Sequence, residues 1–241
     1  MGELEAVLLD VGGTLWSDRL PPDPMVDQLR AARLADLVPE LTVELALLIV
    51  QDLNEQAGAV EEAIMQDTDG SIRESFERTA PLIRAPGAAA VRKALCLPAR
   101  GRLELFPGTL EALAKFKDLH LRCVVVSNGF YRDHDNYLRL LEELGVARYL
   151  DGLVSSVDTG FRKPHPAIFE AALKAANAAP DRCVMVGDNE RKDIRPAVAF
   201  GMRAIRVAIQ EPRPAASDAH AVVTSLPEAA SILEAWVKAP A

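Results

Sequence analysis

Six short apolar runs recur along the chain and alternate with helical patterns. The first run, residues 6–9, has apolar side chains on both faces and ends at Asp10, as expected of a strand buried on both sides. Further runs lie at 123–127, 152–155, 183–187, 204–207 and 221–223, and helical patterns lie at 109–118, 136–144, 167–177, 194–200 and 226–238. This alternation predicts an α/β fold with a doubly wound, mainly parallel sheet.

The segment 18–100 interrupts this alternation. It contains no convincing apolar strand, but helical patterns occur at 25–37, 43–65, 71–80 and 87–95. A crossover between parallel strands needs only about a dozen residues or more, so we interpret the segment as an inserted helical domain. The predicted core then consists of residues 1–17 and 101–241. Packing of these helices on the sheet, as part of a single domain, is the alternative.

The composition excludes several classes of protein. The 241 residues include 27 Lys and Arg against 35 Asp and Glu, for a net charge of −8, so we expect neither nucleic acid nor a membrane surface as a partner. The N-terminus has no basic lead-in, and no segment approaches the roughly 20 apolar residues of a membrane span. We therefore expect a cytoplasmic protein. The sequence does not indicate its oligomeric state.

The three cysteines do not form a recognisable site. Cys96, Cys123 and Cys183 show no CxxC spacing and no Cys/His cluster. An odd number of cysteines does not make a disulfide framework. We expect buried free thiols, above all for Cys123 and Cys183, which begin apolar runs.

Polar residues follow several of the predicted strands. Ligands of an open α/β sheet bind at the carboxyl ends of its strands. The residues at or just beyond these ends comprise three acids, one hydroxyl and one lysine: Asp10, Ser127, Lys163, Asp188 and Asp193. We expect these side chains to meet in one cleft.

This set suits phosphoryl transfer. Asp10 is ionised at neutral pH and needs no separate base to attack phosphorus. Converging carboxylates form a hard-oxygen site that suits Mg²⁺, with Asp10 and Asp188 as direct ligands and Asp193 in a supporting role. Ser127 and the amides beside it are expected to hold a phosphate oxygen, while Lys163 binds the phosphate and tempers the acidic cluster.

Four segments in order resemble the motifs of the haloacid dehalogenase-like (HAD) superfamily. They are Asp10-Val-Gly-Gly-Thr14, Ser127-Asn128-Gly129, Lys163 within RKPHP, and Gly187-Asp188 through Asp193. The resemblance implies a Rossmann-like core, a small phosphorylated substrate and an aspartyl-phosphate at Asp10. It implies catalytic roles for Asp10 and Lys163, substrate contacts from Thr14, Ser127, Asn128 and Lys163, and Mg²⁺ held by Asp10, the carbonyl of Gly12, Asp188 and Asp193. The helical insertion resembles the cap domain that selects substrates in one subgroup.

Gly12 departs from the pattern of phosphatases in this family. Those enzymes have a second Asp at this position, which protonates the leaving group and then activates water. Loss of a well-placed general acid lowers the rate by about 10²–10⁴-fold for a poor leaving group. We therefore expect a phosphatase that is slow on alkyl esters or specialised for acyl or aryl phosphates. Asp18, His134 and His165 are candidates to replace the missing acid.

Three other functions remain open. A phosphonate hydrolase of the same family carries a small residue at the position of Gly12, but it also uses a cap lysine, for which only Lys93 is available. A dehalogenase usually has an aromatic residue there, which Gly12 disfavours. A low-turnover binding or regulatory module would retain the fold without needing the complete set of polar residues.

Overall fold

The computed structural model describes residues 3–17, 24–65, 103–129, 132–211 and 216–238. Its centre is a six-stranded sheet in the order β3-β2-β1-β4-β5-β6, and all neighbouring strands are parallel. The strands are β1 (Ala6–Leu9), β2 (Arg122–Ser127), β3 (Gly152–Ser155), β4 (Cys183–Gly187), β5 (Arg203–Val207) and β6 (Ala221–Val223). The predicted doubly wound α/β sheet is confirmed, and its strand bounds agree to within one residue.

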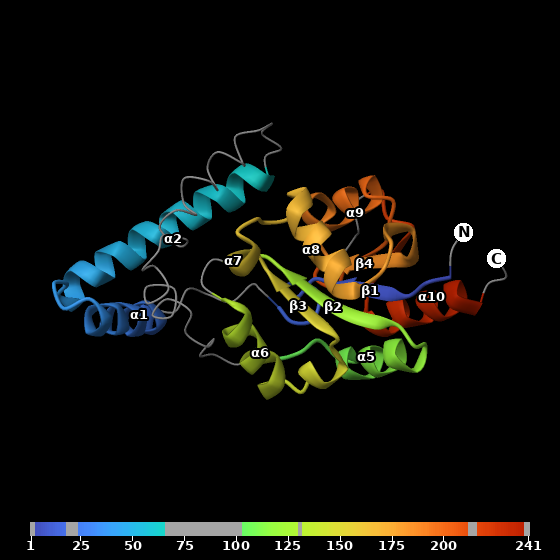
Figure 1. The fold of residues 1–241 in the computed structure, drawn as a ribbon, viewed down its shortest axis with the longest axis horizontal. Helices are drawn as coiled ribbons and strands as arrows, with labels where there is room; N and C mark the ends of the chain where they lie inside the picture. The colour runs from blue at the N-terminus through green and yellow to red at the C-terminus, as the bar shows by residue number, and fades with distance from the viewer. Residues whose placement is uncertain (1–2, 18–23, 66–102, 130–131, 212–215, 239–241) are drawn as a thin grey trace.

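Helices cover both faces of the sheet (Figure 1). One face carries α5 (Thr109–Asp118), α6 (His134–Glu143) and α10 (Leu226–Lys238), and the other carries α8 (Pro166–Ala176) and α9 (Arg195–Ala199). Shorter elements connect them: η1 (Ala147–Tyr149), α7 (Ser156–Thr159), η2 (Pro180–Arg182) and the π-helical turn η3 (Glu190–Ile194). The arrangement explains why the central strands β1 and β4 are apolar at every position, since neither of their faces meets water.

The side chains of β1 show how the two layers form. Val7 and Leu9 belong to the core under α5 and α10, whereas Ala6 and Leu8 belong to the core under α8. All four are fully buried. Full burial of one Leu or Val side chain stabilises the fold by about 1.5–3 kcal/mol. β1 is therefore held firmly at the centre of the sheet, and Asp10 follows it directly.

Helices α1 (Pro24–Leu37) and α2 (Val43–Met65) pack against each other at the end of the sheet opposite the N-terminus (Figure 1). Ala31, Leu34, Ala46 and Val50 form a small apolar cluster between them. The two helices match the predicted segments 25–37 and 43–65. The predicted helices 71–80 and 87–95 lie outside the described residues, and the domain boundaries remain a prediction.

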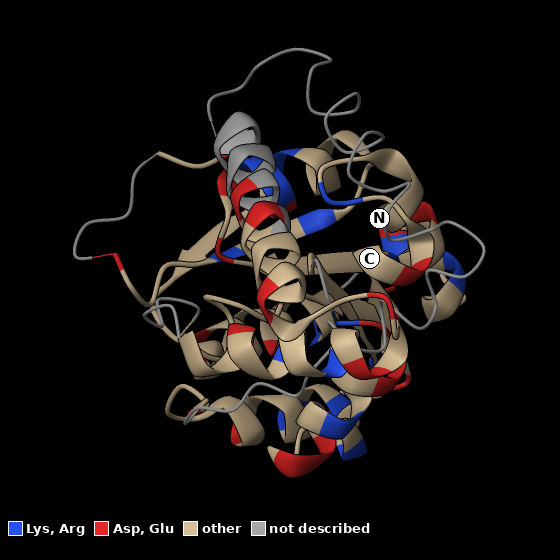
Figure 2. Ribbon diagram, turned by 90° about the vertical axis from the view of Figure 1, so that its left-hand side faces the viewer, with Lys and Arg blue, Asp and Glu red and all other residues tan. Residues whose placement is uncertain are grey.

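The surface charge is mixed in sign. In the view from the side of α1 and α2, acidic and basic residues are interspersed over the described chain (Figure 2). Acidic residues outnumber basic ones in the sequence as a whole, which gives the net charge of −8. None of the described helices combines the length and the apolar character needed to span a membrane.

Candidate active site

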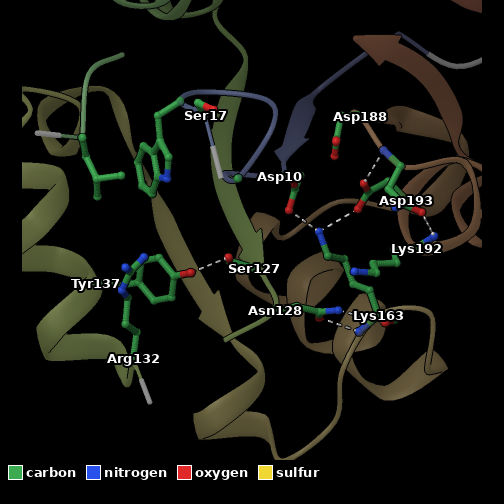
Figure 3. A pocket seen from close by; sticks show the side chains of 14 residues that line it. Asp10, Ser17, Ser127, Asn128, Arg132, Tyr137, Lys163, Asp188, Lys192 and Asp193 are labelled. Carbon is green, nitrogen blue, oxygen red and sulfur yellow. Dashed lines mark hydrogen bonds and ion pairs between the residues drawn. The ribbon is translucent and has the colours of Figure 1, made fainter. Parts of the chain in front are cut away.

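The carboxyl ends of β1, β2 and β4 bring polar side chains into one cavity. β1 pairs with both neighbours in a register that makes the three strands end at nearly the same level. Asp10, Ser127 and Asp188 therefore emerge beside one another, while Lys163 and Asp193 reach the same place from loops. All five line a cavity of about 480 Å³ (Figure 3). The structure thus brings together the five residues that the strand-end pattern had singled out.

Lys163 links two acids in this cavity. Its Nζ donates to Asp10 Oδ1 at 2.5 Å and to Asp193 Oδ1 at 2.6 Å. Only 1% of the side chain of Lys163 is exposed. Burial by itself lowers the pKa of a lysine, but the charges and hydrogen bonds of Asp10 and Asp193 outweigh burial and raise the pKa of Lys163. Lys163 therefore stays protonated and holds the two carboxylates together.

Asn128 fixes the backbone of Lys163. Its Oδ1 accepts a hydrogen bond from the Lys163 amide at 2.7 Å, and its Nδ2 donates to the Lys163 carbonyl at 3.0 Å. Both halves of the side-chain amide are thus used on one residue (Figure 3). Asn128, which the resemblance places on the substrate, also lines the cavity. Its contacts in the structure position Lys163.

Asp193 is aimed at the cavity by the η3 turn. Asn189 begins this turn, and its Oδ1 accepts hydrogen bonds from the amides of Arg191 and Lys192, each at 3.0 Å. The amide of Asn189 in turn donates to Asp193 Oδ2 at 3.1 Å. π-Helical turns are rare and are often found at functional sites. Burial, together with repulsion from Asp10, raises the pKa of Asp193 to about 6 despite the nearby charge of Lys163.

Three carboxylates form a group that suits a divalent cation. One oxygen each from Asp10, Asp188 and Asp193 lies within 4.8 Å of the others. These three acids and Lys163 together carry two net negative charges, which one Mg²⁺ would neutralise. Hard oxygen donors of this kind are those that Mg²⁺ prefers. Gly12 lines the same cavity, but its carbonyl remains a predicted ligand.

Gly13 allows the close approach of β1 to Asp188. Its φ of +75° lies in the left-handed region that favours glycine. A Cβ at this position would collide with the carboxylate of Asp188. The second glycine of the first motif is therefore required for both its backbone angle and its lack of a side chain.

Thr14 lies away from the cavity wall. It is fully buried, and its Oγ1 donates to Asp10 Oδ2 at 3.3 Å. Since Oδ1 of Asp10 accepts from Lys163, each oxygen of the carboxylate has a donor. In the structure Thr14 orients Asp10, whereas the resemblance implies contact with the substrate.

The sequence did not predict the residues behind Ser127. The hydroxyls of Ser127 and Tyr137 form a hydrogen bond of 2.7 Å, and the guanidinium of Arg132 lies 5.5 Å from the centre of the Tyr137 ring. Tyr137 and Arg132 line the cavity, as does Trp16. Tyr137 lies on the apolar face of α6 with Leu140 and Leu141. From the sequence it is therefore indistinguishable from a core residue.

Two further basic residues near the site were also missed. Lys192 lines the cavity, and its pKa is lowered by burial and by the charges of Arg162 and Lys163. Arg162 is 5% exposed, and burial lowers its pKa to about 9. For Arg162, the sequence indicated a place near the site only through its position next to Lys163 in RKPHP.

The two described candidates to replace the missing acid, His134 and His165, lie outside the cavity. Neither His134 nor His165 is among the residues that line the described cavity. His134 is the first residue of α6, and His165 caps α8 by accepting a hydrogen bond from the Ala167 amide at 3.1 Å. Asp18 and Lys93 lie outside the described residues.

Comparison with known proteins identifies the family. A model of the haloacid dehalogenase-like hydrolases matches residues 4–201. The chain belongs to this family. The match spans β1, β2, β3 and β4 and the loops that carry all five cavity residues.

Curated relatives of this hydrolase include named phosphatases. The chain is 38% identical over 106 residues to a glyceraldehyde 3-phosphate phosphatase of Methanothermobacter thermautotrophicus, covering 44% of this chain and 45% of the relative. It is 34% identical over 108 residues to a phosphoserine phosphatase of Thermus thermophilus, covering 45% of this chain and 42% of that protein. The chain thus spans less than half the length of these relatives. A longer match, 25% identical, covers 85% of the chain and 84% of a glyceraldehyde 3-phosphate phosphatase of Methanopyrus kandleri.

Solved structures of HAD hydrolases share the fold. The HAD hydrolase YfnB from Bacillus subtilis, determined with bound magnesium, matches with a TM-score of 0.59 at 17% identity and covers 96% of this chain and 99% of its own. A 2-haloacid dehalogenase from Pseudomonas syringae matches with a TM-score of 0.57 at 23% identity, covering 97% and 99%. At these identities the likeness concerns the fold alone.

Proposed function

We propose that this HAD hydrolase is a Mg²⁺-dependent phosphatase that acts on a small phosphorylated metabolite through an aspartyl-phosphate at Asp10. The observation that carries the proposal is the geometry around Asp10. Its carboxylate lies in one cavity with Asp188 and Asp193, and its Oδ1 accepts a hydrogen bond from Lys163 Nζ at 2.5 Å. The phosphatases among the curated relatives support the same reaction.

In the first step a carboxylate oxygen of Asp10 attacks phosphorus. The new bond between oxygen and phosphorus forms as the bond to the leaving oxygen breaks, and the leaving oxygen keeps the electron pair. Lys163 and Thr14 hold the two oxygens of the carboxylate, so the nucleophile is oriented before the substrate arrives. The hydroxyl of Ser127 lines the cavity and donates to a nonbridging phosphate oxygen.

In the second step water attacks the same phosphorus. The bond from Asp10 to phosphorus breaks and the carboxylate is restored, while the water oxygen stays on phosphorus and both of its protons leave with the dihydrogen phosphate. Asp10, Asp188 and Asp193 would hold Mg²⁺, which would neutralise charge between the acids and the phosphate. Lys163 adds a fixed positive charge beside the reacting oxygen of Asp10.

Gly12 limits which leaving groups the enzyme accepts. It lines the cavity but has no side chain to donate a proton. An alkoxide that departs without protonation is a poor leaving group, so alkyl esters are expected to react slowly. Acyl and aryl phosphates, whose leaving groups are stable anions, are the favoured substrates.

The helical segment is proposed to act as a cap that selects the substrate. α1 and α2 lie at the carboxyl-end side of the sheet (Figure 1), and α2 contacts the η3 turn that carries Asp193. A helical pair in this position can restrict access to the cavity. The proposed cap comprises residues 18–100, of which only 24–65 are described.

The test is a phosphate-release screen over acyl, aryl and alkyl phosphates, with and without Mg²⁺. Release should require Mg²⁺ and be abolished in Asp10→Asn. The variant Gly12→Asp is expected to raise the rate on alkyl esters by up to about 10²-fold, because the new carboxyl can protonate the leaving oxygen. Release that persists unchanged in Asp10→Asn, or in a chelator, contradicts the proposal.

Two other functions are distinguished from a phosphatase by further assays. A dehalogenase releases halide from 2-haloacids, and it does so without the metal. A binding module with little turnover forms no phosphoaspartate at Asp10, so trapping this adduct by mass spectrometry distinguishes an enzyme from such a module. Lys93, which a phosphonate hydrolase would need, lies outside the described residues.

A further inference from the structure

The cavity has a second wall that the phosphoryl chemistry does not use. Trp16, Leu103, Tyr137 and Arg132 line it together with the acidic group. In Figure 3 Tyr137 and Arg132 lie on one side of Ser127, and Asp10, Lys163 and Asp188 lie on the other. A phosphate held between Asp10 and Ser127 therefore has its leaving group beside an aromatic and cationic surface.

Arg132 is held in place by the backbone and by Tyr137. Its carbonyl accepts a hydrogen bond from Ser155 Oγ at 2.8 Å, and its guanidinium lies 5.5 Å from the centre of the Tyr137 ring. Tyr137 is in turn held at its hydroxyl by Ser127 at 2.7 Å. These contacts reduce the freedom that the long side chain of Arg132 would lose on binding a ligand.

The charge of Arg132 is a further feature of this wall. Among the residues that the structure describes, no carboxylate forms an ion pair with it. The neighbouring acid, Asp133, uses its Oδ1 to accept hydrogen bonds from the amide and the side chain of Asn136. A planar guanidinium in this setting matches a carboxylate with two parallel hydrogen bonds.

Gly12 and this wall point to the same kind of leaving group. Without a general acid, the leaving group must depart as a stable anion. A phenol has a pKa of about 10, as in the tyrosine side chain, whereas water, whose conjugate base resembles an alkoxide, has a pKa of about 15.7. A flat phenolate also suits the surface of Trp16 and Tyr137, and the volume of about 480 Å³ is within the range of pockets for small ligands.

From these observations we infer that Arg132 and Tyr137 form a leaving-group subsite for an aryl phosphate that carries a carboxylate on its ring. The inference rests on the proposed phosphatase function and names its substrate class. Arg132 binds the carboxylate, the aromatic side chains contact the ring, and the phosphoryl group faces Asp10. In this arrangement Arg132 determines specificity and takes no part in the bond-breaking step.

The test compares phenyl phosphate with 4-carboxyphenyl phosphate in the full chain with Mg²⁺. A paired carboxylate should raise kcat/KM by about 10–100-fold, as expected for a hydrogen-bonded charge pair. Arg132→Gln should remove this preference, mainly through the KM of the carboxylated substrate. Arg132→Lys should retain part of the preference, because it keeps the charge but loses the planar fork.

Arg148→Gln is the matched control. Arg148 lies 4.8 Å from the centre of the Tyr149 ring, so it forms the same kind of pair, but it is exposed and is not among the cavity residues. This variant should preserve the preference for the carboxylated substrate. Equal kcat/KM for the two aryl phosphates in the wild type, or an unchanged preference in Arg132→Gln, overturns the inference.

A binding measurement separates this inference from the proposed function. Calorimetry with 4-hydroxybenzoate, the leaving group itself, needs no catalysis. Binding that weakens about tenfold or more in Arg132→Gln supports the subsite, and absent or Arg132-independent binding refutes it. Failure of every substrate to release phosphate in an Asp10-dependent way refutes the phosphatase, and the calorimetric result still decides whether the subsite exists.

Discussion

Replacing Lys163 by Met tests the electrostatic arrangement on which the site depends. Met has a similar length and no charge, so the change removes the ammonium and leaves most of the volume filled. In the structure Lys163 and Asp193 are each 1% exposed, and Asp10 is 11% exposed at the side chain. The substitution therefore leaves two carboxylates close together in a largely dry environment.

The expected loss of stability is large. Removal of one partner of a buried ion pair costs about 3–5 kcal/mol, because the other charge stays buried without compensation. For a chain of this size, 1 kcal/mol corresponds to a shift in Tm of roughly 2–4 °C, so Lys163→Met should lower Tm by roughly 6–20 °C. The partial exposure of Asp10 favours the lower half of this range.

Urea and thermal unfolding with and without Mg²⁺ measure the effect. Lys115→Met is the control, because Lys115 pairs with Glu234 at 3.1 Å where both side chains are partly exposed, at 41% and 30%. Loss of such an exposed pair should cost no more than about 1 kcal/mol. A cation near Asp10 and Asp193 replaces part of the missing charge, so Mg²⁺ should stabilise Lys163→Met more than the wild type. If both variants lose the same stability, the reasoning is wrong.

Two further predictions follow from close packing and burial. Gly187→Ala places a Cβ 2.6 Å from Asp193 Cγ, so it should cost about 1–3 kcal/mol in urea unfolding and slow phosphate release. Gly152→Ala, whose Cβ meets its nearest neighbours at 3.4 Å, should cost less, and the reverse order would contradict the packing argument. Burial raises the pKa of Cys123 and of Cys183 to about 12. Iodoacetamide at about pH 8.5 should therefore leave both thiols unmodified in the native protein and label them in urea, as mass spectrometry can verify; native labelling would contradict their burial.

The strands and most helices could be predicted because their signals are local. The run 6–9 is apolar at every position, and the segment 109–118 has a helical pattern; both match the structure in their bounds. The η3 turn at 190–194 was not predicted, since the i to i+5 pattern of a π-helix has no sequence signature comparable to helical periodicity. Its shape depends on Asn189, whose side chain and amide order the turn.

Some residues of the cavity could likewise be predicted from the sequence, and others could not. Asp10, Ser127 and Asp188 could be named because they stand at the ends of recognisable strands. Arg132 and Tyr137 could not, because one precedes a helix and the other occupies a core position of it. Only the packing of α6 against β3, the strand next to β2, turns the Tyr137 hydroxyl toward Ser127.

The sequence by itself determined the α/β class, the strands and the polar residues at the strand ends, because apolar periodicity and the residues that end each strand are properties of short segments. The tertiary structure decided which groups touch. Lys163 meets Asp10 across 153 positions of sequence, and Arg132 reaches the same cavity from the start of α6. Such contacts depend on strand register and on the packing of whole layers, and neither is encoded in any one segment.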